Sequence, residues 1–132
     1  MYRPEIRVLD CTIRDGGLMN DWRFDKAMVK SVFAGLAEAG IDYVELGYRA
    51  DKSAVLERRV RAVAVSATKP TLREVAFECR TKVAVMADVG RTDYNDIVPS
   101  DQSIIRLYRV ATYVKDIVES DRARKSLQRK RV

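Results

Sequence analysis

Residues 8–25 read VLDCTIRDGGLMNDWRFD, and the order of residue types in this stretch decides the fold that we predict. A β-rich apolar run ends at Arg14 and Asp15, and two glycines follow at once. Residues 5–13 therefore predict a strand that ends in a sharp turn. A fixed positive charge beside a carboxylate at that point indicates a candidate ligand site, and the alternative is a tight turn with an exposed ion pair.

Strands and helices alternate along the rest of the chain. Residues 25–40 place apolar side chains at helical spacing, with Asp25 as the N-cap and Gly40 just past the helix end. The remaining predicted elements are strands at residues 41–49, 81–90 and 103–114 and a helix at residues 70–80. This order is typical of a parallel sheet with helical connections, so we predict an α/β fold of about four parallel strands with intervening helices.

The composition bounds the class of protein. The chain has 132 residues, of which 47% are hydrophobic and 33% charged, as expected for one water-soluble domain. No apolar run approaches the roughly 20 residues that span a bilayer, and the N-terminus lacks the layout of a signal peptide. We therefore expect a cytoplasmic protein with no membrane partner. The absence of histidine excludes Ser-His and Cys-His nucleophile pairs and most zinc sites.

Charged residues recur in or after each predicted strand. They are Arg14 and Asp15 after the first strand, Glu45 in the second, Asp88 in the third and Arg109 in the fourth. Ligands bind at the carboxyl end of a parallel sheet, and a set with both signs of charge suits an anionic substrate together with a metal ion. The alternative is that each is a solvated loop residue.

These motifs resemble those of a known family. The stretch LDCTIRDGG, residues 9–17, is similar to the first-strand motif of the DRE-TIM metallolyase superfamily, which is HMG-CoA lyase-like and carries the pyruvate carboxyltransferase domain. The Gly-Gly pair after the aspartate most resembles the 4-hydroxy-2-oxovalerate aldolase-like branch. Three further stretches resemble the next strands of that branch in the same order, namely residues 40–52, 83–103 and 104–117.

The resemblance implies a fold and an activity. The fold would be the N-terminal half of a (β/α)8 TIM barrel, with residues 1–118 as a partial aldolase or lyase domain. The activity would be that of a divalent-metal-dependent carbon–carbon lyase or aldolase, which acts through an enolate on a 2-oxo acid or an acyl-thioester.

The resemblance also implies roles for individual residues. Arg14 would be catalytic and stabilise the enolate oxygen, and Asp15 would be a ligand of Mg²⁺ or Mn²⁺. Gly16 and Gly17 would let the backbone turn sharply and leave space for substrate. The match is looser for three further substrate-binding candidates, whose alternative role is polar packing inside the barrel: Glu45, Asp88 and Arg109.

The chain departs from the family in two respects. The family completes its metal site with a His-x-His pair on a later strand, and this sequence contains no histidine. A complete barrel needs roughly 200 residues or more, whereas the matched strands end near residue 118. We therefore expect an incomplete metal site and a half-barrel that is inactive alone. Its open sheet edges would lead it to self-associate or to pair with a complementary half-barrel.

The positive charge of the chain lies in two segments. Residues 53–70 carry a net charge of +3 and residues 120–132 carry +5, out of +6 for the whole chain. A nucleic-acid-binding module is therefore an alternative, but residues 119–132 form a basic tail without aromatic side chains, so nucleic acid is not the expected partner. A Schiff-base aldolase that uses Lys82 is another alternative, but this lysine begins its predicted strand, at the end away from the site.

Both basic segments are atypical of the family. The tail has almost nothing to bury where a fourth helix is expected, and another reading frame permits an apolar helix face there. We therefore hypothesise that residues 53–70 and 120–132 are frameshifted translation. Resequencing the gene is expected to reveal single-base changes that restore a longer family-like frame. A gene in which no such change restores that frame would contradict the hypothesis.

Overall fold

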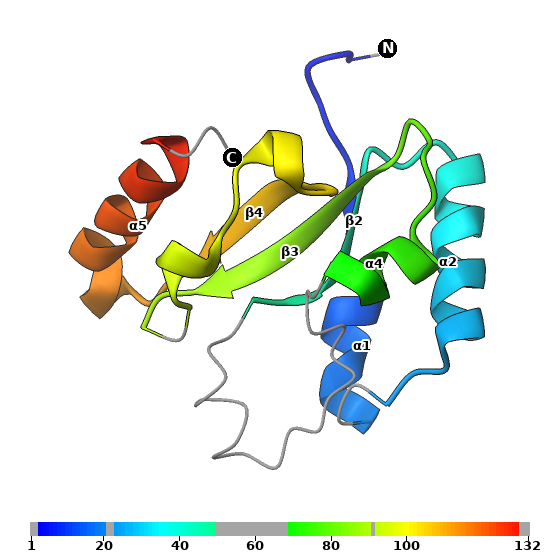
Figure 1. Ribbon diagram of the computed structural model, residues 1–132, viewed down its shortest axis with the longest axis horizontal. Coiled ribbons are helices and arrows are strands. Elements are labelled where there is room, and N and C mark those ends of the chain that lie inside the picture. The colour runs from blue at the N-terminus through cyan, green and yellow to red at the C-terminus, as the bar shows by residue number, and fades with distance from the viewer. Residues whose placement is uncertain (1–2, 21–22, 50–68, 91, 130–132) are drawn as a thin grey trace.

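The computed structural model describes residues 3–20, 23–49, 69–90 and 92–129, and four parallel strands form its centre (Figure 1). The strand order follows the chain, β1-β2-β3-β4, and every neighbouring pair is parallel. This arrangement confirms the predicted α/β fold, with four strands in the order of half a barrel. The strands are β1 Leu9–Asp10, β2 Tyr43–Tyr48, β3 Lys82–Asp88 and β4 Ile105–Ala111.

Helices flank this sheet at both sides. In Figure 1, α2 and α4 lie side by side, α5 lies next to β4, and α1 lies beyond the carboxyl ends of the first two strands. The α-helices are α1 Thr12–Asn20, α2 Lys26–Glu38, α4 Lys69–Val75 and α5 Ile117–Arg129. Short 3-10 turns occur at η1 Tyr94–Asp96, η2 Ser100–Gln102 and η3 Val114–Asp116.

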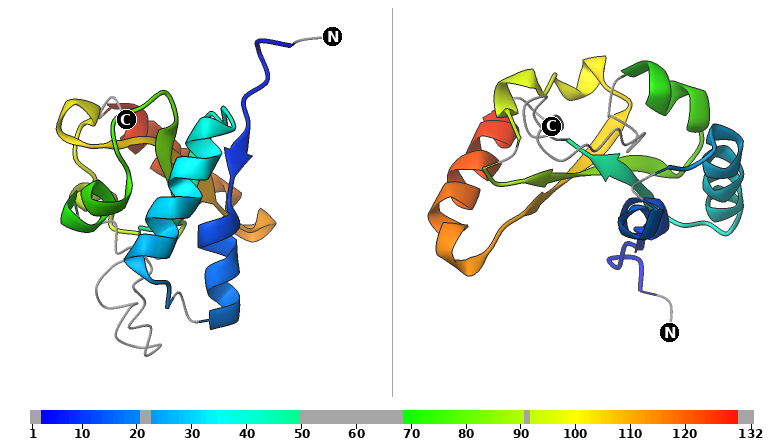
Figure 2. Two further views of the ribbon diagram at one scale, coloured as in Figure 1. Left: turned by 90° about the vertical axis from the view of Figure 1, so that its right-hand side faces the viewer. Right: turned by 90° about the horizontal axis from the view of Figure 1, so that it is seen from below.

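The first strand is much shorter than the sequence predicts. Only Leu9 and Asp10 pair with β2, and the segment before them extends away from the body of the molecule (Figure 2). The reason lies in Asp10, whose carboxylate accepts hydrogen bonds from the backbone N–H and the hydroxyl of Thr12, at 3.0 and 2.9 Å. This local bonding starts α1 at Thr12. Of the predicted strand over residues 5–13, only Leu9 and Asp10 are therefore confirmed, and the prediction is wrong for the residues on either side.

The second helix forms as the sequence predicts. The carboxylate of Asp25 accepts a hydrogen bond from the backbone N–H of Ala27 at 2.6 Å, which caps the first turn of α2. Gly40 follows the helix with a φ of 79°, and the N–H of Ile41 reaches back to the carbonyl of Leu36 at 3.1 Å. These are the bonds of a Schellman ending, and they direct the chain into β2.

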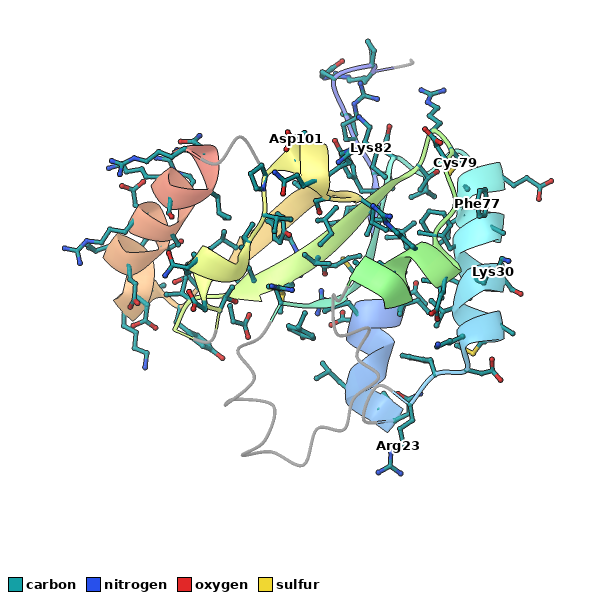
Figure 3. All side chains as sticks on the ribbon, in the orientation of Figure 1. Arg23, Lys30, Phe77, Cys79, Lys82 and Asp101 are labelled. Atoms are coloured by element: carbon teal, nitrogen blue, oxygen red, sulfur yellow. The ribbon has the colours of Figure 1, made fainter. Side chains whose placement is uncertain are left out.

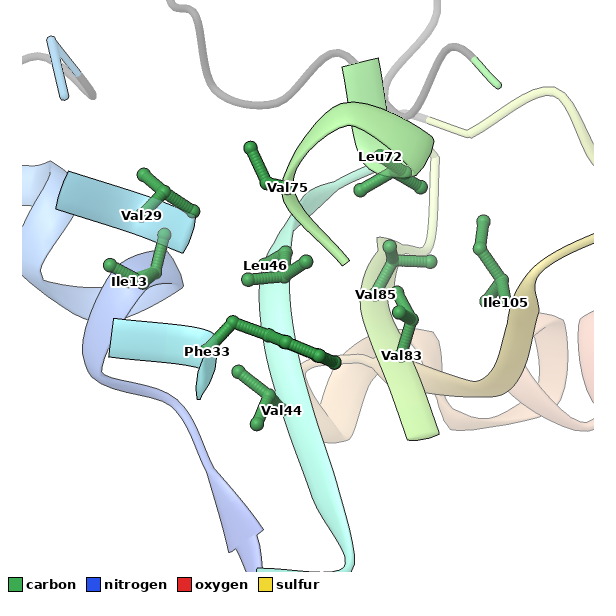
Figure 4. Close-up of a cluster of buried hydrophobic side chains, with 10 residues drawn as sticks. All are labelled: Ile13, Val29, Phe33, Val44, Leu46, Leu72, Val75, Val83, Val85 and Ile105. Carbon is green, nitrogen blue, oxygen red and sulfur yellow. The ribbon is translucent and has the colours of Figure 1, made fainter. Parts of the chain in front are cut away.

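The apolar core lies between the sheet and the helices (Figure 4). Phe33 of α2 is completely buried and meets the ring of Phe77 edge-on, with ring centroids 5.4 Å apart. Because side chains alternate along a strand, β2 and β3 direct a second set of side chains to the face away from this core. The buried cluster consists of Ile13, Val29, Phe33, Val44, Leu46, Leu72, Val75, Val83, Val85 and Ile105.

A register irregularity in β2 changes which of its side chains share a face. Glu45 lies opposite Ala84, whereas Tyr48, three residues later, lies opposite Met86, only two residues after Ala84. The strand therefore carries one extra residue relative to β3, as in a β-bulge. Strict alternation would separate Glu45 from Tyr48, but the bulge places both on the face away from the core.

A second irregularity occurs in β4. Val83 of β3 lies opposite Ile105, and the next residue of β3 lies opposite Leu107, so Arg106 is the extra residue. The guanidinium of Arg106 donates to two backbone carbonyls of the preceding turn. This bulge lets Ile105 join the core while Arg109 lies on the opposite face of the sheet.

The structure describes most of the second basic segment but little of the first. Residues 53–68 lie outside the described part of the chain. The tail forms most of α5, which buries only Ala123 and Leu127 and leaves Ile117 and Val118 exposed. Two side chains of the tail are thus buried, and the others described in α5 are exposed or half-buried. Within the described residues, no helix combines the length and apolar character needed to cross a membrane.

Candidate functional site

A buried ion-pair cluster occupies the face of the sheet away from the apolar core. Its centre is Glu45 of β2, whose side chain has no exposed surface. Arg14 Nε donates to Glu45 Oε2 at 2.6 Å. Arg109 donates twice, from Nε to Oε1 at 2.9 Å and from Nη2 to Oε2 at 2.8 Å. The structure thus brings together three residues that the sequence predicted, from α1, β2 and β4.

The helix α1 positions Arg14. Ile13 is buried in the core, which fixes the helix against the sheet, and the neighbouring Arg14 turns toward Glu45. The guanidinium of Arg14 also lies over the ring of Tyr48, 5.8 Å from its centroid. Only 11% of the Arg14 side chain is exposed, so its charge is held in place largely by protein contacts.

The glycine pair does not form the expected turn. Gly16 and Gly17 lie within α1, and among the described glycines a positive φ occurs at Gly40 and Gly90. A Cβ at Gly16 would meet Phe24 Cζ at 3.7 Å, an ordinary contact distance. The role of these glycines in a sharp turn is therefore wrong, because the chain has already entered a helix. Their role in substrate binding stays a prediction.

Asp15 lies at the outer edge of the cluster. Its carboxylate forms an ion pair with Arg14 Nη1, and 62% of its side chain is exposed. No group of three or more Cys, His, Asp or Glu side chains that could hold a metal ion occurs in the part of the chain that the structure describes. Because Glu45 is occupied by two arginines, Asp15 is the one candidate ligand left at this place. Water can fill several of the six positions around Mg²⁺ or Mn²⁺, but the site that the resemblance implies also needs a His-x-His pair, and the sequence contains no histidine. Asp15 alone therefore does not fit that site.

The charges of the cluster stabilise one another. Burial favours the neutral form of Glu45, but hydrogen bonds from Arg109 and Arg14 outweigh this effect and hold the pKa of Glu45 below its usual value. Burial also opposes the charge of Arg14, yet its hydrogen bonds to Glu45, Tyr48 and Cys11 raise its pKa. The hydrogen bonds of Arg109 to Glu45 raise the pKa of Arg109 as well. All three groups are therefore charged at neutral pH.

Three neighbours of the cluster were missed from the sequence. The guanidinium of Arg14 lies over the ring of Tyr48, and Met86 Sδ accepts a hydrogen bond from Arg109 Nη2 at 2.9 Å. Both depend on the bulges, which have no clear signal in the sequence. Cys11 contacts the pair from the end of β1, and burial together with the charge of Glu45 raises the pKa of its thiol. The raised pKa favours the protonated thiol, which is a weaker nucleophile than the thiolate.

Two other candidates lie apart from the cluster. Asp88 ends β3, next to Ala111 in the register, and its charge acts with burial and Glu119 to raise the pKa of Tyr94. Lys82 is exposed and begins β3, as the sequence predicted. Figure 3 shows Lys82 at the upper end of that strand, whereas α1 lies beyond the opposite ends. This position argues against a Schiff-base role for Lys82.

The burial of Glu45 leads to a prediction about stability. Glu45→Gln removes the charge that pairs two guanidinium groups, so these are left without their buried partner. We expect the free energy of unfolding to fall by about 3 kcal/mol, the size typical of a broken buried pair. Urea denaturation followed by circular dichroism measures this change.

Glu74→Gln is the matched control, because Glu74 pairs with Lys26 at the surface and exposed pairs contribute at most about 1 kcal/mol. The pKa of Glu45 is depressed in the folded state, so its contribution is present above the ordinary carboxyl pKa and is lost as the pH falls through the folded value. The difference between wild type and Glu45→Gln should therefore shrink in acid. Equal losses in the two variants at pH 7 would contradict the buried pairing.

Comparisons with known proteins agree with the α/β fold described above and identify a distant relative. No protein-family model matches the chain. A 4-hydroxy-2-oxovalerate aldolase from Pelotomaculum thermopropionicum is 27% identical over 118 residues, which cover 86% of this chain and 33% of the aldolase. The chain thus spans about a third of the length of this curated relative.

A solved structure shares the fold. It is the N-terminal domain of a candidate aldolase from Bacteroides vulgatus, which matches 95% of this chain with a TM-score of 0.74 and 22% identity. The matched region is 42% of that chain. The present chain is therefore a distant homologue of 4-hydroxy-2-oxovalerate aldolase, with the α/β fold of part of an aldolase domain.

Proposed function

We propose that the chain carries the enolate-binding corner of a carbon–carbon lyase or aldolase that acts on a 2-oxo acid or an acyl-thioester. The observation that carries this proposal is the Arg14 guanidinium, held on the fully buried Glu45 beside the carboxyl ends of the strands. The distant homology to 4-hydroxy-2-oxovalerate aldolase supports the class of reaction.

Arg14 would act by charge stabilisation. When a carbon–carbon bond next to a carbonyl is made or broken, negative charge develops on the carbonyl oxygen. A guanidinium that is already fixed in place stabilises this oxygen without first reorganising. Glu45 and the ring of Tyr48 fix Arg14 in this structure, so its charge needs little rearrangement.

The metal of the family does not enter this proposal as a step. The described residues offer Asp15 as a single oxygen ligand, and Asp15 is already paired with Arg14. A bound Mg²⁺ or Mn²⁺ would need ligands beyond those that the described residues provide. What these residues support on their own is binding and orientation of the substrate's carbonyl group.

Oxalate tests this proposal, because it is a planar dianion that resembles the enolate of pyruvate. We expect isothermal titration to show oxalate binding to the wild-type chain and at least tenfold weaker binding to Arg14→Gln, since a charge-assisted hydrogen bond is lost. Arg124→Gln is the control, because Arg124 pairs with Asp121 on the surface of α5 and carries the same charge. Oxalate binding that is equal in all three proteins, or absent from the wild type, would contradict the proposal.

The sheet edges favour a second candidate function, in which the chain is a half-barrel subunit. Within the described residues, β1 pairs with β2 alone and β4 pairs with β3 alone, so both outer strands are open. Exposed apolar side chains follow β4, with Val114 at 89% exposure. We propose that two copies associate through these edges, because β4 of one copy offers a parallel partner to β1 of the other.

Sedimentation velocity tests the association. We expect the wild-type chain to sediment as a dimer and Val114→Lys to shift it toward the monomer, because a charge would enter the contact. Lys115→Ala is the control next to it, on an exposed residue of the same turn. A monomeric wild type would contradict self-association, and a complementary half-barrel on another chain would then be the candidate partner.

A further inference from the structure

Two exposed apolar segments lie at the same end of the sheet. One is the end of α1, where the exposed fraction is 60% for Leu18 and 89% for Met19. The other is residues 113–118, which follow β4. Because α1 follows β1 and the four strands are parallel, both segments lie beyond the carboxyl ends of the strands (Figure 1). The exposed apolar side chains of the second segment are Tyr113, Val114, Ile117 and Val118.

The apolar end of α1 continues the side of the helix that carries the ion pair. Residues four apart in a helix share a face, so Leu18 lies one turn after Arg14 and Met19 lies one turn after Asp15. A partner that covers this end of α1 would therefore also shield the outer edge of the ion-pair cluster.

The segment after β4 is left open by the helix that follows it. The buried side chains of α5 are Ala123 and Leu127. Val118 precedes Leu127 by about two and a half turns, so it lies on the opposite face of α5, away from the body of the molecule. Single exposed apolar residues are common in proteins, but four of them within six residues indicate a contact surface.

The sheet topology selects a second copy of the chain as the partner. Within the described residues, β1 and β4 each have one open edge. Parallel pairing of β4 in one copy with β1 in another sets their carboxyl ends side by side. The segment after β4 then lies next to the helix that follows β1 in the neighbouring copy, so the two exposed apolar segments meet.

We propose that the apolar end of α1 in one copy docks on residues 113–118 of a second copy. This inference rests on the self-association proposed above and names a second contact surface for it. The contact is head-to-tail, because it joins two different surfaces, and it occurs twice in a closed pair. Four strands from each copy give eight, which is enough to close a small barrel.

Complementary charges test this contact in sedimentation equilibrium. Leu18→Lys and Val118→Asp are each expected to weaken the dimer at least tenfold, because a charge enters an apolar contact. An equimolar mixture of the two variants should recover the dimer, since one contact of the mixed pair then joins opposite charges and the other is unchanged. Met28→Lys is the control, because Met28 is likewise exposed but lies on α2, beside α4.

The outcomes separate this contact from the pairing of the strand edges. Circular dichroism first confirms that each variant is folded. If the wild type dimerises but Leu18→Lys leaves the dimer unchanged, or if the mixture of variants stays monomeric, the docking inference is overturned and the pairing of strand edges stands. Growth beyond two copies would overturn the closed pair. A monomeric wild type would overturn both proposals.

Discussion

A carboxylate without access to water needs partners of opposite charge, and Glu45 finds two of them in distant parts of the chain. Arg14 precedes it by 31 residues and Arg109 follows it by 64. The pairing therefore links α1, β2 and β4 across the face of the sheet. It forms only when α1 starts directly after Asp10 and when both bulges set the register. The same contacts that hold the sheet together thus also orient the groups that are candidates for ligand binding.

The pairing of Glu45 with two arginines determines which chemical groups the site offers. Positive charge is supplied by two guanidinium groups with a shared anchor, and carboxylate oxygens available for metal coordination are scarce among the described residues. A buried ion pair is weak evidence for stability by itself, because desolvation opposes its Coulombic gain. Here the two guanidinium groups of Arg14 and Arg109 are balanced by the carboxylates of Glu45 and Asp15, and these pairings fix both cations on one face of the sheet.

Patterns in the sequence predict much of the fold, but they predict only part of the candidate site. Apolar periodicity, the cap at Asp25 and the glycine at Gly40 predict α2, and short apolar runs predict β2, β3 and β4 at nearly their observed positions. The start of α1 was not predictable in this way, because Thr12 and Ile13 have β-branched side chains and the deciding contact is a side-chain hydrogen bond from Asp10.

Among the candidate site residues, Arg14, Glu45 and Arg109 come together in one ion-paired cluster, whereas the neighbouring Tyr48 and Met86 were missed. Their positions depend on an added residue in a strand, and no composition or spacing rule reveals where that residue falls.

The position of Arg106 has a consequence for comparing this chain with its relatives. A relative without the extra residue in β4 would have its arginine one position closer to Ile105, and a gapless alignment would then equate residues that point to opposite sides of the sheet. Strand by strand superposition, not percentage identity, is the sound basis for transferring the role of Arg109 between these proteins.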